Sequence, residues 1–206
     1  DIVILAVKPN VIESVLVQIK EEVKNKEILV ISIAAGVKLD SIKSILGNST
    51  KIIRAMPNTP ASIMEGVTAI SPNENTNSED RKKAQLLFEC VGKVTEIKEK
   101  EIDIFTALIG SGPAYVFYLI ESLLNSSENL SLSDTEKVEL ISSMIKGAAK
   151  LASVSEDSPK ILRNKVTSPG GVTQRAIEEF EKNKLKEIIK ESMESAEKRS
   201  IELGEN

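Results

Sequence analysis

The sequence contains no histidine and no tryptophan, and its one cysteine is Cys90. Without histidine, a mechanism that needs an imidazole base or a histidine metal ligand is excluded. A single cysteine excludes a disulfide within the chain and is typical of a protein from a reducing compartment, the cytoplasm. Cys90 has apolar neighbours in the sequence and is predicted to be a core residue.

Positive charge and long apolar runs are also scarce. The 27 basic and 31 acidic residues give a net charge of −4, which provides no basic surface for nucleic acid. No apolar run approaches the length of a membrane span. We therefore expect neither nucleic acid nor a membrane as a partner, and we expect no metal site. With 206 residues and 41% apolar content, the chain is long enough for one large or two small domains.

The first half of the chain alternates strand patterns with helix patterns. Residues 2–7 are a continuous apolar run, typical of a strand buried on both faces of a parallel sheet. The later segments repeat the alternation and predict an incomplete Rossmann-type α/β domain over residues 1–99. The expected strands are 2–7, 28–33, 51–56, 67–70 and 93–97, and the expected helices run from Val11 to Val23, from Leu39 to Leu46, and from a cap at Ser78 to Val91.

A Rossmann domain normally has a phosphate-binding loop, and this sequence has no G-x-G-x-x-G. Gly110 and Gly112 begin such a pattern, but Tyr115 stands where the third glycine belongs. The motif occurs at the first strand-to-helix turn, where its backbone wraps the pyrophosphate. We therefore expect this sequence to be N-terminally incomplete, lacking the opening βαβ region.

Residues 100–206 have only helical patterns. A proline at position 113 predicts a break or kink near Gly110 to Pro113. Only four Phe and two Tyr occur in the whole chain, so these helices must pack with Leu, Ile and Ala. Such helices bury their faces poorly alone, which predicts a partner subunit. The expected caps are Ser133 with Glu136, Ser158 before Pro159, and Asn183.

The stretch from Val166 to Thr173 has the most unusual composition. Ser168 is predicted to cap the helix that follows, with Pro169 at its first position. Gly170 and Gly171 each cost roughly 1 kcal/mol relative to alanine inside a helix, so two together indicate a close approach to the backbone. Free N–H groups at a helix start attract anions. An ordinary capped turn with flexible glycines explains these residues equally well.

Five blocks, in order and across nearly the whole chain, resemble pyrroline-5-carboxylate reductase. Residue 172 departs from the family, because Val172 stands where many members have Thr or Ala. The blocks are residues 6–9 (Ala-Val-Lys-Pro), 32–36 (Ser-Ile-Ala-Ala-Gly), 54–60 (Arg-Ala-Met-Pro-Asn-Thr-Pro), 110–115 (Gly-Ser-Gly-Pro-Ala-Tyr) and 168–173 (Ser-Pro-Gly-Gly-Val-Thr).

This resemblance implies the NAD(P)H-dependent reduction of 1-pyrroline-5-carboxylate to L-proline, the last step of proline biosynthesis. It also implies a second domain, residues 100–206, that is all-α, binds substrate and forms an interlocked dimer, like the C-terminal domain of 6-phosphogluconate dehydrogenase. Family members sometimes assemble these dimers into rings. The residues that read the ribose 2′ position fall outside the sequence, so the choice between NADP(H) and NAD(H) stays open.

The resemblance also implies roles for individual residues. Thr173 aligns with a threonine that hydrogen-bonds the ring nitrogen of the substrate. The substrate carboxylate is expected at the amides of Gly170, Gly171 and Val172, with the hydroxyl of Ser168 nearby. Glu156 aligns with an acidic residue near the site, although a solvated loop carboxylate explains it equally well.

The cofactor is expected at the carboxyl ends of three strands, where open parallel sheets bind ligands. The resemblance implies that the residues there face the nicotinamide and its ribose; for Lys8, an exposed loop lysine is the commoner case. They are Ala6, Val7, Lys8 and Pro9 after the first strand, Ala34, Ala35 and Gly36 after the second, and Pro57 and Asn58 at the third.

Two alternatives stay open. Another dehydrogenase of the 6-phosphogluconate or hydroxyacid type would share this plan, but it normally uses a lysine or histidine near the reacting carbon, and residues 168–173 contain neither. A catalytically inert dimerisation fragment is favoured by the missing phosphate loop.

Overall fold

The computed structural model describes residues 1–204 and divides into two compact units. The first unit comprises Asp1–Pro113 and Ser192–Asn206, and the second comprises Ala114–Glu191. The first contains the sheet, and the second is helical. The boundary near Glu99 between a nucleotide-binding and an all-α domain stays a prediction.

The sheet of the first unit has five strands in the order β1-β2-β3-β4-β5. Neighbouring strands pair in parallel, except that β4 runs antiparallel to β3. The connection from β3 to β4 holds only the short 3₁₀ helix η2 (Thr59–Ile63), and a connection without a crossover helix favours antiparallel pairing. The parallel sheet predicted from the sequence is therefore wrong at this one step. The strands are β1 (Ile2–Leu5), β2 (Leu29–Ser32), β3 (Ile52–Pro57), β4 (Gly66–Pro72) and β5 (Gly92–Glu96).

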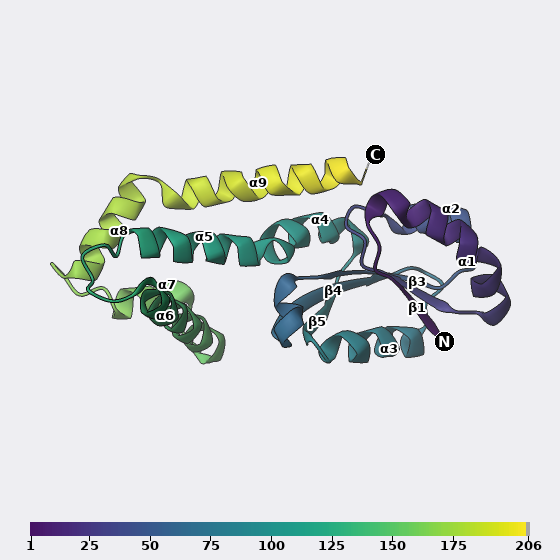
Figure 1. Cartoon of the computed structure of the whole chain (residues 1–206), viewed down its shortest axis with the longest axis horizontal. Coiled ribbons are helices and arrows are strands. Elements are labelled where there is room, and N and C mark those ends of the chain that lie inside the picture. The colour runs from purple at the N-terminus through teal and green to yellow at the C-terminus, as the bar shows by residue number, and fades with distance from the viewer. Residues whose placement is uncertain (205–206) are drawn as a thin grey trace. The chain divides into compact units, whose positions relative to one another are not determined.

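Helices cover both faces of this sheet. Helices α1 (Ile12–Lys26) and α2 (Leu39–Leu46) lie on one face and α3 (Ser78–Glu89) lies on the other (Figure 1). One core cluster joins α1 and α2 to the sheet through residues such as Leu16 and Ile42, and a second joins α3 through Phe88. All four residues of β2 are buried, as expected for a central strand with both faces covered.

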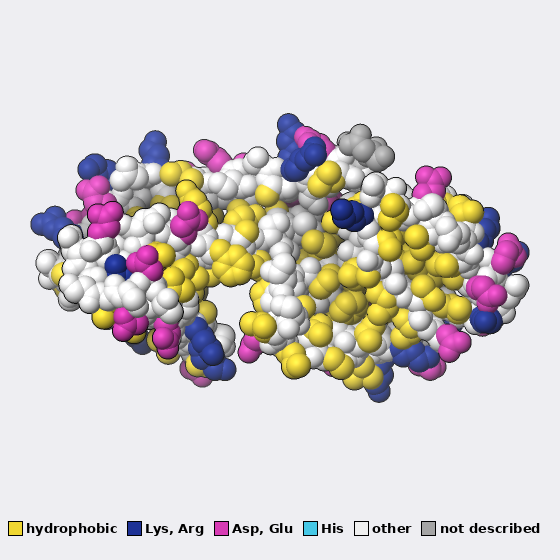
Figure 2. Space-filling model, in the orientation of Figure 1, with side chains coloured by type: hydrophobic (Ala, Val, Ile, Leu, Met, Phe, Trp, Pro, Cys, Tyr) yellow, Lys and Arg dark blue, Asp and Glu magenta, His cyan; other side chains and the backbone are white. Residues whose placement is uncertain are grey.

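Strand β1 differs from its prediction as a strand buried on both faces. Val3 and Leu5 pack into the cluster beneath α1 and α2, whereas Ile2 and Ile4 are exposed. The α3 cluster contains no residue of β1, so this helix leaves the second face of the edge strand open. Figure 2 shows hydrophobic side chains (yellow) at the surface of the sheet-containing unit.

Two predictions around α3 are wrong. Asn77, not Ser78, caps the helix: its side chain accepts from the Asp80 N–H, and Asp80 accepts from the Asn77 N–H in return. Cys90 is exposed rather than buried, because it lies at the end of α3, where its thiol donates to the carbonyl of Leu86.

The helical region begins with the 3₁₀ turn η3 (Glu99–Glu101). The predicted break at Gly110 to Pro113 is confirmed, since the π-helical turn η4 (Thr106–Gly110) ends there and α5 starts at Gly112. The elements are α4 (Ile102–Phe105), η4, α5 (Gly112–Asn125), α6 (Asp134–Val154), α7 (Pro159–Lys165), α8 (Val172–Lys182) and α9 (Leu185–Leu203).

The caps of these helices follow the prediction in two cases of three. Ser133 and Glu136 form the capping box of α6, and Ser158 caps α7. Asn183 does not cap α9. It ends α8 and donates its side-chain amide to the Glu179 carbonyl, and Lys184 takes a left-handed conformation between the two helices.

The stretch Glu99–Asn125 carries many exposed apolar side chains. By length and composition alone it is apolar enough to cross a membrane, and only 6% of its most apolar window is buried within the chain. The expectation that no segment reaches this limit is therefore wrong. Such a surface needs a covering partner of some kind.

Candidate functional site

The turn before α8 differs from the predicted cap. The Gly171 N–H donates to the Ser168 carbonyl over 3.0 Å, and Gly170 has a φ of +71°. With Pro169 in second place, these features are those of a type II β-turn. The turn delays the helix, so α8 begins at Val172 with Gly171 as its N-cap. Ser168 as a helix cap and Pro169 as a first helical residue were therefore wrong predictions.

Glycine suits each of the two positions in this turn for a different physical reason. Gly170 takes a positive φ, a backbone conformation that residues with a side chain rarely adopt. At Gly171, a Cβ would lie 2.5 Å from the hydroxyl oxygen of Ser168. The close approach predicted for these glycines thus occurs inside the turn itself, and it places the Ser168 hydroxyl beside the start of α8.

The backbone amides at this helix start fall into two groups. The Gly170 N–H donates to Oε1 of Gln174 over 2.6 Å, and the Gly171 N–H is used by Ser168. Within the described part of the chain, the N–H groups of Val172 and Thr173 have no acceptor. Two of the three predicted carboxylate-binding amides are thus already hydrogen-bonded. Sequence reasoning missed Gln174, whose signal is a glutamine at the third helical position, where a side chain can reach back to the helix start.

The remaining predicted substrate residues are exposed. The Thr173 hydroxyl has no hydrogen bond to another described residue, and the Val172 side chain is 90% exposed. Glu156 lies exposed between α6 and α7, next to Asp157, whose carboxylate pairs with Lys165. Among the described residues, the amides of Val172 and Thr173 and the Thr173 hydroxyl therefore stay without a partner at the first turn of α8.

The predicted cofactor residues lie together at one edge of the sheet. Ala6 to Pro9 follow β1, Ala34 to Gly36 follow β2, and Pro57 with Asn58 ends β3. Because β1, β2 and β3 are parallel neighbours, their carboxyl ends meet at the same edge. These residues belong to the first compact unit, whereas the predicted substrate residues belong to the second.

Asn58 has a structural role at this edge. Its carboxamide nitrogen donates to the Ile109 carbonyl over 3.1 Å, and its oxygen accepts from the Val67 N–H over 2.8 Å. Lys8 and Ala35, in contrast, are exposed, and the Lys8 ammonium has no ion pair among the described residues.

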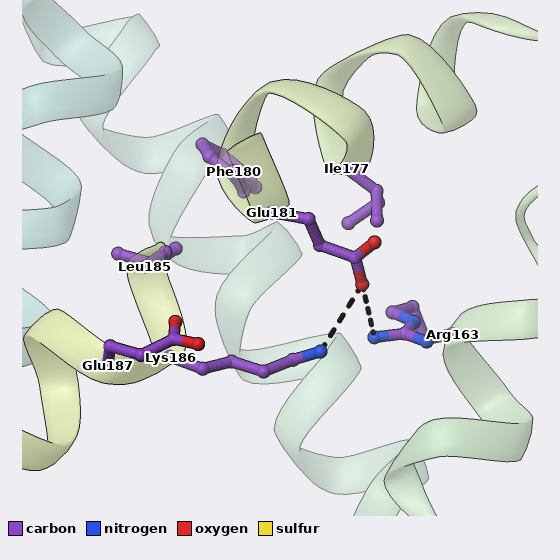
Figure 3. Close-up of a pocket in the computed structure, with 7 residues that line it drawn as sticks. All are labelled: Arg163, Ile177, Phe180, Glu181, Leu185, Lys186 and Glu187. Atoms are coloured by element: carbon purple, nitrogen blue, oxygen red, sulfur yellow. Dashed lines mark hydrogen bonds and ion pairs between the residues drawn. The ribbon is translucent and has the colours of Figure 1, made fainter. Parts of the chain in front are cut away.

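A separate hollow of roughly 440 Å³ lies in the helical unit between α7, α8 and the start of α9 (Figure 3). Glu181 pairs there with both Lys186 and Arg163. Ile177, Phe180 and Leu185 form its apolar wall. None of the predicted site residues lines this hollow, and its cations are already paired, so it is a poor candidate for the carboxylate site.

Comparison with known proteins identifies the family. Residues 99–203 match the family model for pyrroline-5-carboxylate reductase dimerisation. The pyrroline-5-carboxylate reductase of Methanosarcina acetivorans is 37% identical over 99% of this chain and 75% of its own length. The Arabidopsis thaliana enzyme is 36% identical over the whole chain and 74% of its own length.

Solved structures agree with these matches. A Plasmodium falciparum pyrroline carboxylate reductase with NADP bound has a TM-score of 0.92 and 37% identity, over 99% of this chain and 77% of that one. The Coxiella burnetii pyrroline-5-carboxylate reductase has a TM-score of 0.91 and 38% identity, over 98% of this chain and 75% of that one. The α/β fold predicted from the sequence is thereby confirmed. The chain belongs to the pyrroline-5-carboxylate reductase family, the oxidoreductases that form proline with NAD(P)H.

Proposed function

We propose that this protein reduces 1-pyrroline-5-carboxylate to L-proline at a site built on the start of α8. The observation that carries the proposal is the set of polar groups there that have no partner among the described residues: the amides of Val172 and Thr173 and the hydroxyl of Thr173. The hydroxyl of Ser168 lies beside them. Together they match a small ring that carries one carboxylate and one imine nitrogen.

The carboxylate is the anion that a helix start attracts. We assign it to the Val172 and Thr173 amides and the Ser168 hydroxyl. Gly170 and Gly171 shape the turn, and Glu156 borders the site. Reduction adds a hydride to the imine carbon and a proton to the nitrogen. NAD(P)H supplies the hydride when bound.

Thr173 is assigned to the ring nitrogen. The pKa of an alcohol lies far above the range in which it would act as a strong acid, so its hydroxyl orients the nitrogen or relays a proton from water. Orientation alone is a large contribution, since a well-placed reacting pair avoids much of the entropy cost of encounter.

For the cofactor, we propose NADP(H) or NAD(H) at the sheet edge formed by Ala6 to Pro9, Ala34 to Gly36, and Pro57 with Asn58. Small exposed side chains such as Ala35 leave room for a flat ring, and Lys8 provides a positive charge that no described residue pairs. The Plasmodium falciparum relative with NADP bound supports the phosphorylated form.

We also propose a homodimer in the cytoplasm, built through the family's dimerisation region, with rings of dimers as a further assembly. The apolar stretch Glu99–Asn125 then lies against the partner subunit rather than in a membrane. A chain with one exposed cysteine fits a reducing compartment.

The test is NADPH oxidation on addition of pyrroline-5-carboxylate, measured with this chain and with the chain extended upstream by a first βαβ unit. We expect proline to form in step with NADPH loss in the extended chain. Absence of turnover in both proteins would contradict the proposed reaction.

Thr173→Ala tests the assigned catalytic contact. We expect kcat to fall by about a hundredfold, within the range for losing a positioned proton-transfer group, with little change in melting temperature. Thr135→Ala is a matched control, because Thr135 is also an exposed threonine at the second position of a helix. If both variants turn over as fast as the parent, Thr173 has no role in the reaction.

A further inference from the structure

Glu99 joins three segments that are far apart in the sequence. Its Oε1 accepts a hydrogen bond from the Leu39 N–H over 2.7 Å, and the same oxygen lies 3.4 Å from Nη1 of Arg54. Leu39 is the first residue of α2, and Arg54 lies on β3. All three residues belong to the sheet-containing unit.

Both contacts provide a partner for a polar group that would destabilise the fold if it had none. Arg54 is 4% exposed, and a buried guanidinium without a carboxylate is strongly destabilising. The Leu39 N–H is one of the donors that have no partner within their own helix, and the N-cap residue Lys38 provides no side-chain cap for it. One carboxylate therefore replaces a missing cap and neutralises a buried charge. Its negative charge also suits the positive end of the α2 dipole.

The loop between β2 and α2 is held at its other points as well. The buried hydroxyl of Ser32 accepts from the Ala34 N–H over 3.3 Å. Gly36 has a φ of +77°, and a Cβ there would lie 2.9 Å from the Leu203 carbonyl at the end of α9. Ser200 on α9 in turn donates to Asp103 on α4 over 2.6 Å. The loop is thus hydrogen-bonded to Ser32 of β2 at its start and to Glu99 at its end, and its middle lies close against the end of α9.

We infer that Glu99 is a positioning residue for the cofactor. Its hydrogen bond to the Leu39 N–H fixes the end of the loop, and through this bond it holds Ala34, Ala35 and Gly36 in the shape to which the nucleotide binds. This inference rests on the proposed function, which assigns that loop to the cofactor.

Glu99→Ala is the direct test, with hydrogen exchange of residues 34–39 measured without nucleotide and NADPH affinity measured by fluorescence. The affinity is measured in this chain or, if this chain does not bind NADPH, in the chain extended upstream by a first βαβ unit. We expect faster exchange at Leu39 and a dissociation constant raised about tenfold, the effect of leaving buried polar groups unpaired. The kcat at saturating NADPH should stay close to that of the parent, because Glu99 does not touch the reacting atoms.

Three further variants sharpen the result. Glu99→Gln keeps an oxygen for the Leu39 N–H and should restore most of the protection. Glu99→Asp keeps the charge but is one methylene too short for Leu39, and it replaces Glu99→Ala if that protein does not fold. Glu21→Ala, at an exposed carboxylate on α1 with no partner among the described residues, should change neither readout.

Ala35→Leu separates this inference from the proposed function. If Ala35→Leu weakens NADPH binding and Glu99→Ala leaves exchange and affinity unchanged, the role of Glu99 is refuted and the cofactor loop stands. If Glu99→Ala loosens the loop and neither variant affects NADPH binding, the cofactor assignment of the loop is refuted.

Discussion

The two compact units differ in how completely they bury their own apolar side chains. The sheet-containing unit has two buried clusters, with residues such as Ile31 and Ile42 fully excluded from solvent. In the helical unit, all of whose residues are described, Lys137 is the one buried residue. Phe117 and Tyr118 on α5 are 62% and 72% exposed. The first unit has a buried core of its own, whereas the second has an apolar surface that a partner subunit must cover.

The largest expected effect is a loss of folding stability in the sheet-containing unit. Ile31→Ala removes a fully buried side chain from β2 and should lower the free energy of unfolding by about 2–5 kcal/mol, from lost burial and the cavity left behind. Urea unfolding followed by circular dichroism measures it. Ile2→Ala, at the exposed face of β1, is the control and should cost much less. Equal losses for the two variants would refute the assigned core.

The next effect belongs to the helical unit. Phe117→Glu places a charge on the exposed apolar face of α5 and should raise the dimer dissociation constant about 30-fold or more, as loss of an interface anchor does. Analytical ultracentrifugation measures it. Leu86→Glu, on α3 of the sheet-containing unit and similarly exposed, should leave association unchanged. A dimer that resists Phe117→Glu would place the interface elsewhere.

The smallest effect concerns the surface of α6. The hydrogen bond from Ser133 lowers the pKa of Glu136 below its ordinary value of 4.5. A carboxyl group with a lowered folded-state pKa stabilises the protein above pH 4.5 and loses this contribution as the pH falls through the lowered value. Glu136→Gln should therefore be less stable than the parent at pH 7, and the difference should vanish as the pH falls below the lowered pKa of Glu136.

Thermal unfolding across this pH range measures the difference. Glu139→Gln, at another exposed carboxylate of α6, is the control. A gap between parent and Glu136→Gln that stays constant down to the lowest pH would contradict the role of the capping box.

The sequence predicted the elements well where one local signal dominates. The helix Leu39–Leu46 has the predicted bounds, because apolar spacing starts it and Gly47 ends it. Local signals failed where two neighbours compete, as Asn77 does with Ser78 at the start of α3. The exposed face of β1 could not be predicted, since an apolar run does not reveal which neighbours cover it.

The same division applies to the candidate site. The turn at Gly170 and Gly171 was visible as composition, but its hydrogen bond to Gln174 depends on how the turn delays α8. The contact between Glu99 and Leu39 joins residues 60 positions apart, and no local sequence pattern predicts it. Periodicity and caps are local, whereas the groups that hold a site often meet only after folding.

The most direct test of the contrast between the two units is the mass of this chain in solution, measured by sedimentation at micromolar concentration. The account predicts a dimer with twice the chain mass of 22.4 kDa, because the helical unit buries almost nothing alone. A stable, well-folded monomer of 22.4 kDa would contradict it.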